Sequence, residues 1–177
     1  KTHAGVLGLA GPTDNVALAL RNEQGKTILA KASGPVVHAV GGGLVIYDGE
    51  VELAGSGGDQ IYSNLNVVVN GGLFDLNGRV EGFGALAGTN GLVRNDDAAL
   101  ATLTVGENGN SGSYAGTITD GAGPIALIKV GTGTQTLTGT NTVSGGIAVS
   151  NGTLQVDGQL NGSAVTVAAN ATVLGAG

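Results

Sequence analysis

Apolar and polar residues alternate in short runs along most of the chain, and each run ends at a turn rich in Gly, Asn or Asp. Ile147-Ala148-Val149 and Leu154-Gln155-Val156 are typical of these runs. Strict alternation indicates a β-strand with one buried face, and turns this close together leave no room for helices. The pattern therefore predicts an all-β chain that changes direction every few residues.

A ten-residue pattern recurs, with apolar residues at its first, sixth and eighth positions and Gly at its fourth and tenth. It occupies residues 46–55, 69–78 and 149–158, and a degenerate copy follows at 167–174. A spacing of about 20 residues that tolerates insertions is typical of β-helix coils, in which each strand lies on the equivalent strand of the next coil. We therefore expect a single elongated parallel β-solenoid with on the order of eight coils.

The composition indicates a folded chain and argues against several classes of partner and site. Gly accounts for 35 of 177 residues, yet hydrophobic residues make up 41%, and with only 3% aromatic residues the core is expected to be Val, Leu, Ile and Ala. The net charge is -6 without a basic cluster, which argues against nucleic acid and anionic membranes as partners. Cys is absent, which excludes disulfides, thiolate zinc sites and cysteine nucleophiles. No apolar run reaches the roughly 18 residues of a membrane span, so we expect no membrane insertion by this segment.

The most specific motif lies between Leu127 and Leu154. Its matching residues are Leu127, Lys129, Gly131, Gly133-Thr134, Thr136-Leu137, Gly139, Asn141-Thr142, Gly145, Val149 and Gly152-Thr153-Leu154. The segment resembles the passenger-associated β-strand repeat of bacterial autotransporters, whose pattern is approximately L-x-K-x-G-x-G-T-x-T-L-x-G-x-N-T-Y-x-G-x-T-x-V-x-x-G-T-L. Val143 replaces the usual aromatic residue and Ile147 the usual Thr, and both retain high β-propensity.

This resemblance extends over residues 67–177, whereas the first 65 residues match only through the copy at 46–55. We therefore expect residues 1–65 to form a β-rich N-terminal segment that supplies the first coils or a cap. Residues 66–177 are expected to form the parallel β-helix with passenger-type repeats. Because the chain starts at Lys1 without an initiating Met or a signal peptide, we expect a processed product or a piece of a longer protein.

The resemblance also implies a biological setting. It implies a right-handed parallel β-helix that is secreted across the outer membrane and lies outside the bacterium or on its surface. Such a helix serves as a structural or adhesive stalk, as a passenger module or as a filament-forming subunit. Catalysis, cofactors and metals are not expected of it.

Asp96 and Asp97 form the only adjacent acidic pair, and Arg94 precedes them. They lie either in a solvated loop or in a catalytic or calcium site. Catalytic carboxylates must converge, whereas adjacent residues of a strand point to opposite faces, so the loop is favoured.

Four further aspartates, Asp48, Asp75, Asp120 and Asp157, lie beside turns, where Asp accepts hydrogen bonds from backbone N–H groups. An alternative is that Asp75 and Asp157 stack on one face with Glu52. They would then form an acidic stripe able to hold a hydrated cation. The turn interpretation is favoured.

Three other motifs are weak. Residues 55–62 are similar to the calcium-binding nonapeptide G-G-x-G-x-D-x-U-x, but the Asp is one place early and no second copy follows, so we expect a turn. Thr alternates from Thr132 to Thr142, where we expect one solvent-facing strand rather than an ice-binding array across coils. His3 and His38 are the only histidines. We expect His38 to be a surface or hydrogen-bonded strand residue rather than a general base or metal ligand.

The main alternative is a carbohydrate-active or carbohydrate-binding β-helix. It requires carboxylates and a basic residue in a groove lined with aromatic rings that stack on sugars. The chain offers only five such rings, of which Phe74 is expected to be internal: Tyr47, Tyr62, Phe74, Phe83 and Tyr114. We therefore expect no enzyme.

Two kinds of partner are expected for a rod of this type. Open strand edges on an end coil template further strands, and Val165-Thr166-Val167 carries no charged residue, so end-to-end self-association is one expectation. The other is a host or matrix surface ligand, bound within residues 1–66.

Overall fold

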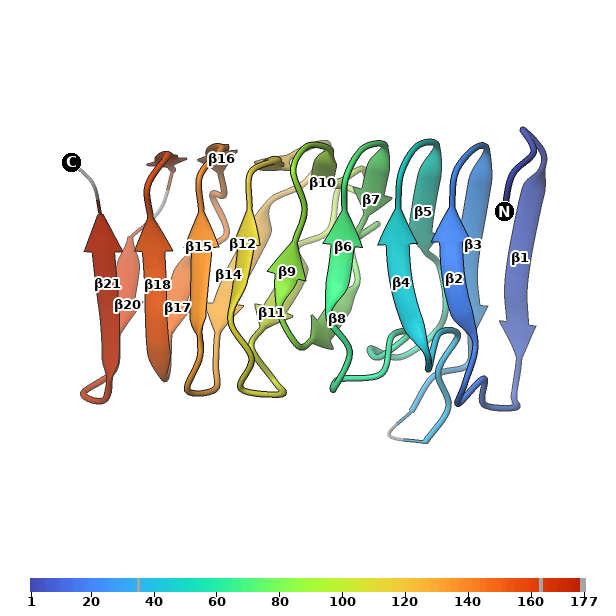
Figure 1. Ribbon diagram of the computed structural model, residues 1–177, viewed down its shortest axis with the longest axis horizontal. Coiled ribbons are helices and arrows are strands. Elements are labelled where there is room, and N and C mark those ends of the chain that lie inside the picture. Colours follow the sequence, from blue (N-terminus) through green and yellow to red (C-terminus); the bar gives the residue numbers. More distant parts are fainter. Residues whose placement is uncertain (35, 163, 176–177) are drawn as a thin grey trace.

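The structure is a computed structural model that describes residues 1–34, 36–162 and 164–175. Within these residues the chain forms strands β1 to β21 and no helix. All ladders between named strands are parallel, and each strand pairs with its equivalent in the next coil. The predicted all-β parallel solenoid is therefore confirmed, and its coils follow one another from the N-terminal to the C-terminal end (Figure 1).

From the fourth coil onward, each coil contributes one strand to each of three faces. Face 1 contains β1 (Val6–Gly11), β3 (Lys26–Lys31), β5 (Glu50–Leu53), β7 (Leu73–Asp75), β10 (Leu92–Asn95), β13 (Thr117–Asp120), β16 (Thr140–Thr142) and β19 (Gln159–Asn161). Face 2 contains β8 (Val80–Phe83), β11 (Ala101–Val105), β14 (Ile125–Lys129), β17 (Ile147–Val149) and β20 (Val165–Val167). Eight strands on face 1 therefore mark eight coils.

Face 3 consists of two four-stranded sheets joined by a bridge between Gly88 and Tyr114. The first sheet contains β2 (Ala19–Asn22), β4 (Gly43–Ile46), β6 (Val67–Val69) and β9 (Leu86–Ala87). The second contains β12 (Gly112–Tyr114), β15 (Thr134–Leu137), β18 (Gly152–Val156) and β21 (Ala171–Gly175). Strands from residues 1–65 and from residues 66–177 thus share faces 1 and 3.

Face 2 has no named strand in the first three coils that the structure describes. There, the described residues 12–18, 32–34 with 36–42, and 54–66 connect face 1 to face 3. We call these three connections the loop cluster. Residues 54–66 lie against the first strand of face 2, because the backbone of Gln60 and Ile61 is bonded to Glu81 of β8.

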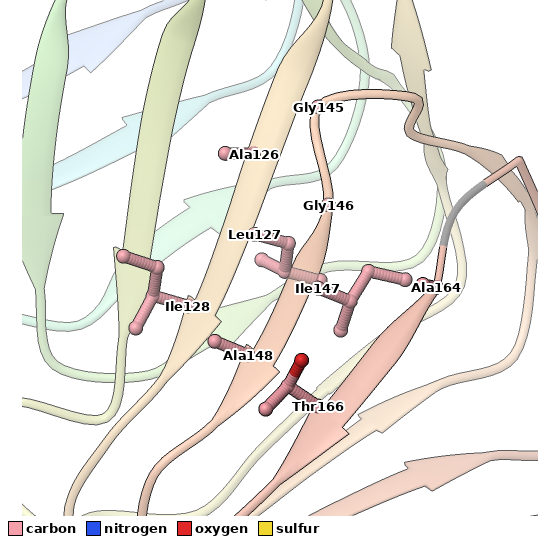
Figure 2. Close-up of a pocket in the computed structure, with 9 residues that line it drawn as sticks. All are labelled: Ala126, Leu127, Ile128, Gly145, Gly146, Ile147, Ala148, Ala164 and Thr166. Carbon is pink, nitrogen blue, oxygen red and sulfur yellow. The ribbon is translucent and has the colours of Figure 1, made fainter.

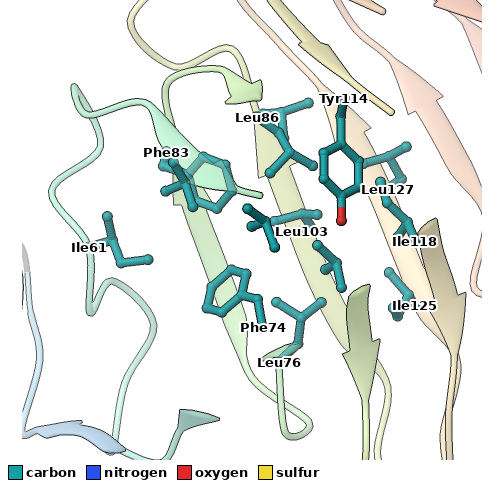
Figure 3. Packing of buried hydrophobic residues seen from close by; sticks show 14 of the residues in the cluster. Ile61, Phe74, Leu76, Phe83, Leu86, Leu103, Tyr114, Ile118, Ile125 and Leu127 are labelled. Carbon is teal, nitrogen blue, oxygen red and sulfur yellow. The ribbon is translucent and has the colours of Figure 1, made fainter. Parts of the chain in front are cut away.

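The interior is a set of apolar ladders along the solenoid axis (Figure 3). One ladder on face 1 runs through Val51, Phe74, Val93 and Ile118, which are register partners in successive coils. Alternation places these side chains inside because successive residues of a strand point to opposite sides. Stacking equivalent residues fills the narrow interior without voids.

Aromatic residues contribute more to this core than the composition predicts. Phe74 is internal as expected, but Phe83 and Tyr114 are also fully buried. The rings of Phe74 and Phe83 lie 6.3 Å apart. Space for Tyr114 is provided by Gly116, where a Cβ would overlap the phenol ring. The predicted core of small aliphatic residues is therefore correct but incomplete.

The alternating threonines do not form the single solvent-facing strand that we expected. Thr134 and Thr136 lie on β15 of face 3, whereas Thr140 and Thr142 lie on β16 of face 1. Thr134 also stacks on Thr153 of the next coil, which the sequence analysis did not foresee. Gly139 stands at the corner between the strands, where any Cβ would strike the backbone of Gly116.

Candidate functional site

The loop cluster holds a buried histidine between two carboxylates. Nδ1 of His38 lies 3.2 Å from Oδ1 of Asp14, and Nε2 lies 3.2 Å from Oδ2 of Asp59. The His38 side chain is only 3% exposed. Tyr62 stacks on the imidazole with ring centroids 4.2 Å apart. His38 is hydrogen-bonded as predicted, but it lies in a loop rather than in a strand.

The three residues come from three successive coils. Asp14 lies in the first connection of the loop cluster, His38 in the second and Asp59 in the third. Their sequence separations of 24 and 21 residues match the coil period. The sequence analysis missed this triad, although polar residues one coil apart in three consecutive connections were the signal that could have found it.

Near this triad, where the described residues form no strand on face 2, polar side chains form hydrogen bonds with the backbone that strands would otherwise form. The amide of Gln60 pairs with the backbone of Lys31 as a strand would, through bonds of 2.9 and 3.0 Å. Glu81 in turn accepts the backbone N–H of Gln60 at 2.8 Å. Burial raises the pKa of Glu81 to about 8 because a charge is poorly solvated in the core.

Asp59 combines several unusual features. Its backbone has φ +100, a region that residues other than Gly rarely adopt. In the described part of the chain its Oδ1 is buried and has no hydrogen-bond partner. Burial raises the pKa of Asp59, and the neighbouring His38 opposes that rise. The segment 55–62 is a connection without strand structure, in agreement with the predicted turn.

A polar cavity of about 260 Å³ lies beside Asp59. Ser63, Thr104 and Glu107 also line it. Aromatic rings are absent from its lining, so it lacks the stacking platform of a sugar site. Of the five rings in the chain, only Tyr47 and Tyr62 have exposed or partly exposed surface, since Phe74, Phe83 and Tyr114 are fully buried.

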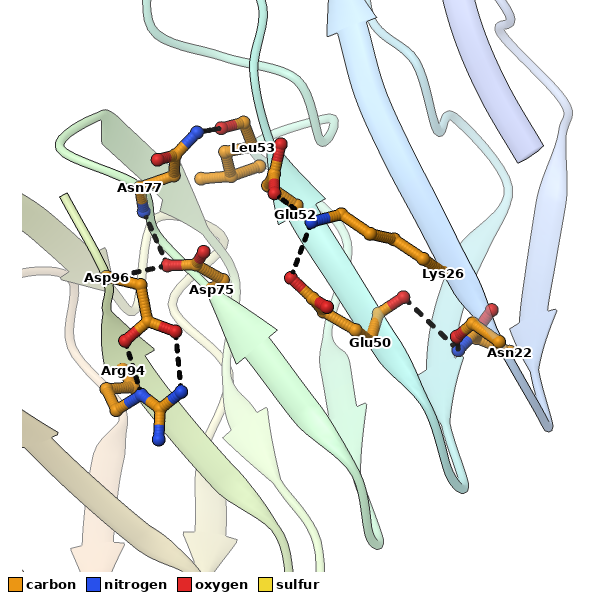
Figure 4. A network of polar contacts seen from close by, with 10 residues as sticks. Asn22, Lys26, Glu50, Glu52, Leu53, Asp75, Asn77, Arg94 and Asp96 are labelled. Carbon is orange, nitrogen blue, oxygen red and sulfur yellow. Dashed lines mark hydrogen bonds and ion pairs between the residues drawn. The ribbon is translucent and has the colours of Figure 1, made fainter. Parts of the chain in front are cut away.

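A second acidic group lies on face 1. One carboxylate oxygen from each of Glu50, Glu52 and Asp75 lies within 4.8 Å of the others. Lys26 supplies the positive charge: its Nζ lies 2.9 Å from Glu50 and is also paired with Glu52 (Figure 4). Among the described residues, this is the only set of three that could hold a metal ion, and its charge is already partly neutralised.

The predicted acidic stripe is therefore partly wrong. Glu52 and Asp75 are register partners on β5 and β7. Asp157 follows β18 on face 3, where it accepts two bonds of 3.0 Å from the amide of Gln155. The reason is that the second half of the ten-residue pattern lies on face 1 in the copies at 46–55 and 69–78 but on face 3 in the copy at 149–158.

The remaining aspartates act largely at turns. Asp75 accepts the N–H groups of Asn77 and Asp96 at 2.9 and 3.0 Å, and burial raises its pKa. Asp120 accepts the N–H of Ile125 at 2.8 Å. Asp48 accepts the N–H of Gly49 at 2.7 Å. These three aspartates agree with the turn interpretation, whereas Asp157 accepts from a side chain instead.

Asp96 and Asp97 lie in an exposed loop, as favoured. Asp96 forms a two-pronged ion pair with Arg94, with both contacts at 2.5 Å (Figure 4). Asp97 accepts the N–H of Ala99 at 2.8 Å and so closes the turn. The two carboxylates therefore have separate partners, one a basic side chain and the other the backbone.

An apolar groove of about 370 Å³ lies on the outer side of face 2 (Figure 2). Nine uncharged residues line it, mostly small: Ala126, Leu127, Ile128, Gly145, Gly146, Ile147, Ala148, Ala164 and Thr166. Ile128, Ala148 and Thr166 are register partners in successive coils. The groove thus follows the solenoid axis across β14, β17 and β20.

The segment from β14 to β18 forms slightly more than one coil. Leu127, Leu137 and Leu154 point into the core, and Lys129 is also fully buried. Its Nζ donates to the carbonyl oxygens of Val130 at 2.5 Å, Gly131 at 2.9 Å and Asn151 at 3.3 Å. Lys129 therefore satisfies backbone acceptors where two coils turn.

A family model described as passenger-associated-transport-repeat matches residues 127–156. The chain carries a passenger-associated-transport-repeat. The resemblance noted in the sequence is thereby confirmed for this segment. Comparisons with curated proteins and with solved structures gave no match.

The geometry explains several features of the repeat. Its apolar positions face the core, its Lys caps carbonyl groups, and its Gly131 has φ +65 where a Cβ would strike the backbone of Gly106. The repeat family belongs to autotransporter passengers and implies secretion to the cell surface. Within the described ranges, no helix is long and apolar enough to cross a membrane.

Proposed function

We propose that this chain is a non-catalytic β-helical module of an exported bacterial passenger, and that it acts as a stiff spacer outside the cell. The observation that carries the proposal is that the passenger-associated-transport-repeat occurs in a solenoid whose face 1 is one strand ladder through all eight coils. Each ladder pairs the backbone of one coil with the next, and such solenoids resist bending and proteolysis.

Localisation is tested with antibodies against residues 1–177 on the bacterium that encodes the chain. Intact cells or their culture medium should be labelled. Labelling only after the cells are permeabilised would contradict export. Incubation of the purified chain with a panel of glycans should release no new reducing ends, and their release would contradict the non-catalytic role.

The spacer is also proposed to associate through the coil formed by β19, β20 and β21. Val165 and Val167 occupy inward positions of this coil, yet they are 42% and 45% exposed. No charged residue occurs from Gly158 to Gly175. An uncharged strand edge beside exposed core residues favours the addition of a coil from a second copy.

We further propose that residues 1–66 bind a host or matrix surface ligand. Its support is the loop cluster, since connections displayed on a rigid scaffold commonly carry binding residues. A glycan and matrix-protein array probed with the whole chain, and with the variant Asp59→Ala, tests it. Binding that depends on Asp59 is expected, and no binding by either protein would contradict it.

A further inference from the structure

The hydrogen-bonding geometry around His38 fixes how many protons the loop cluster holds. A carboxylate only accepts hydrogen bonds, whereas imidazole donates from both nitrogens only when it is protonated. With both ring nitrogens 3.2 Å from carboxylate oxygens, neutral His38 would place a lone pair against a carboxylate. The closed arrangement therefore requires an imidazolium, or a proton on Asp14 or Asp59.

We propose that Asp14, His38 and Asp59 form a pH-sensitive latch, which holds the loop cluster closed at mildly acidic pH and releases it when these shared protons are lost. The latch joins three coils through one side chain. Asp14 also accepts the backbone N–H of His38 at 2.8 Å, so both the ring and the backbone of the second connection depend on it.

Other ionisable groups surround the latch. Burial raises the pKa of Glu81 of β8, and the charge of Asp59 adds a smaller rise. Tyr62 stacks on the imidazole, and Lys31 of β3 donates to the carbonyl oxygen of Thr13 at 2.7 Å, next to Asp14. One further carboxylate, one phenol ring and one lysine thus lie near the latch.

The titration of the carboxyl groups favours closure at mildly acidic pH. Burial raises the pKa of Asp59 and that of Glu81, so the folded chain keeps protons that the unfolded chain has released. Their contribution to stability therefore falls as pH rises above 3.8 for Asp59 and above 4.5 for Glu81. The backbone N–H of His38 lowers the pKa of Asp14, so its contribution is lost only in stronger acid.

Loss of the shared protons should open only the loop cluster, because the described residues of the first three coils form no strand ladder on face 2. Its connections are joined by scattered backbone hydrogen bonds instead of a strand ladder, such as those from Asn15 to the carbonyl oxygen of His38 at 3.1 Å and from Ala39 to that of Gln60 at 2.7 Å. Faces 1 and 3 keep their strand pairing beneath it. Opening would expose Val40 and Ile61, which are fully buried in the closed state.

Hydrogen exchange of the whole chain at about pH 5.5 and about pH 8.5, corrected for intrinsic exchange rates, tests the latch. Protection in residues 12–18, 36–42 and 54–62 should fall about tenfold more at the higher pH than protection in β11 and β14 does. An equal change in the loop cluster and in these strands would overturn the proposal.

Asp59→Asn is the decisive variant. Its amide can donate to the Nε2 lone pair of neutral His38 while Nδ1 still donates to Asp14, so no extra proton is needed. Asn also tolerates positive φ. The variant should stay protected at about pH 8.5. Retention of the wild-type pH dependence would overturn the latch, and Asp157→Asn on face 3 is the matched control.

Discussion

Lys129 and Asn151 belong to neighbouring coils, and the buried ammonium of Lys129 donates to the carbonyl oxygen of Asn151 at 3.3 Å. The same Nζ serves the carbonyl oxygens of Val130 and Gly131. A motif lysine that looks like a surface residue in the sequence is thus an internal cap. A buried ammonium group normally needs a charged counter-ion. Here three carbonyl dipoles take the place of that counter-ion.

Replacement of this lysine should weaken the stack. Lys129→Met leaves three carbonyl groups without their donor, and we expect the free energy of unfolding to fall by roughly 1–3 kcal/mol. Denaturant titration measures it. Arg79→Met, which removes an exposed charge of the same sign, should change stability little, and equal losses in the two variants would argue against the capping role.

Glu81 should make stability depend on pH. Because its pKa is raised to about 8, the folded state holds a proton between pH 4.5 and 8 that the unfolded state releases, and stability falls across this window. Glu81→Gln should reduce the loss of unfolding free energy across this pH window by up to roughly 3–5 kcal/mol. Thermal unfolding at several pH values provides the comparison. Glu23→Gln, at an exposed glutamate, should retain the wild-type slope, and a variant at Glu81 that also retains it would refute this account.

Lys26 should be needed to hold the acidic group of face 1 together. Lys26→Met leaves Glu50, Glu52 and Asp75 to repel one another, and we expect a loss of about 1 kcal/mol because the site is partly exposed. The loss should shrink at high salt and be largely recovered by adding Glu50→Gln. Chemical denaturation of the single and double variants decides the matter. A double variant less stable than the single one would contradict the repulsion.

Association through the terminal coil should depend on whether the inward or the outer side of β20 is substituted. Val167→Lys puts a charge at an inward position of the exposed coil, whereas Thr166→Lys puts it on the outer side of the same strand. We expect only the first to shift the chain toward monomer in sedimentation velocity. A wild-type chain that stays monomeric at high concentration would rule out this contact.

The coils were predictable because their signals are local. Alternation and turn residues lie within ten positions of one another, and a residue's side of the strand follows directly. Which face a pattern occupies is not local, and Asp157 was therefore misplaced beside Asp75. The burial of Tyr114 likewise depends on the preceding coil, where the carbonyl oxygen of Gly91 accepts its hydroxyl hydrogen at 3.0 Å.

The loop cluster was harder to predict for a physical reason. Its contacts join side chains one coil apart, and a sequence read strand by strand does not pair Asp14 with His38 or Gln60 with Glu81. These pairs are separated by 24 and 21 residues, so the coil period links them once the solenoid is known. Polar residues inside a repeat protein therefore become interpretable only after the register is set.

The register of the coils is tested most directly by disulfide formation in the cysteine-free chain. Thr134 and Thr153 are partners on β15 and β18, and adjacent strands lie about 4.8 Å apart, within reach of a disulfide. The double variant Thr134→Cys and Thr153→Cys should cross-link rapidly on mild oxidation, while Thr134→Cys with Gln155→Cys should not. Cross-linking of the second pair but not the first would contradict the stacked parallel coils.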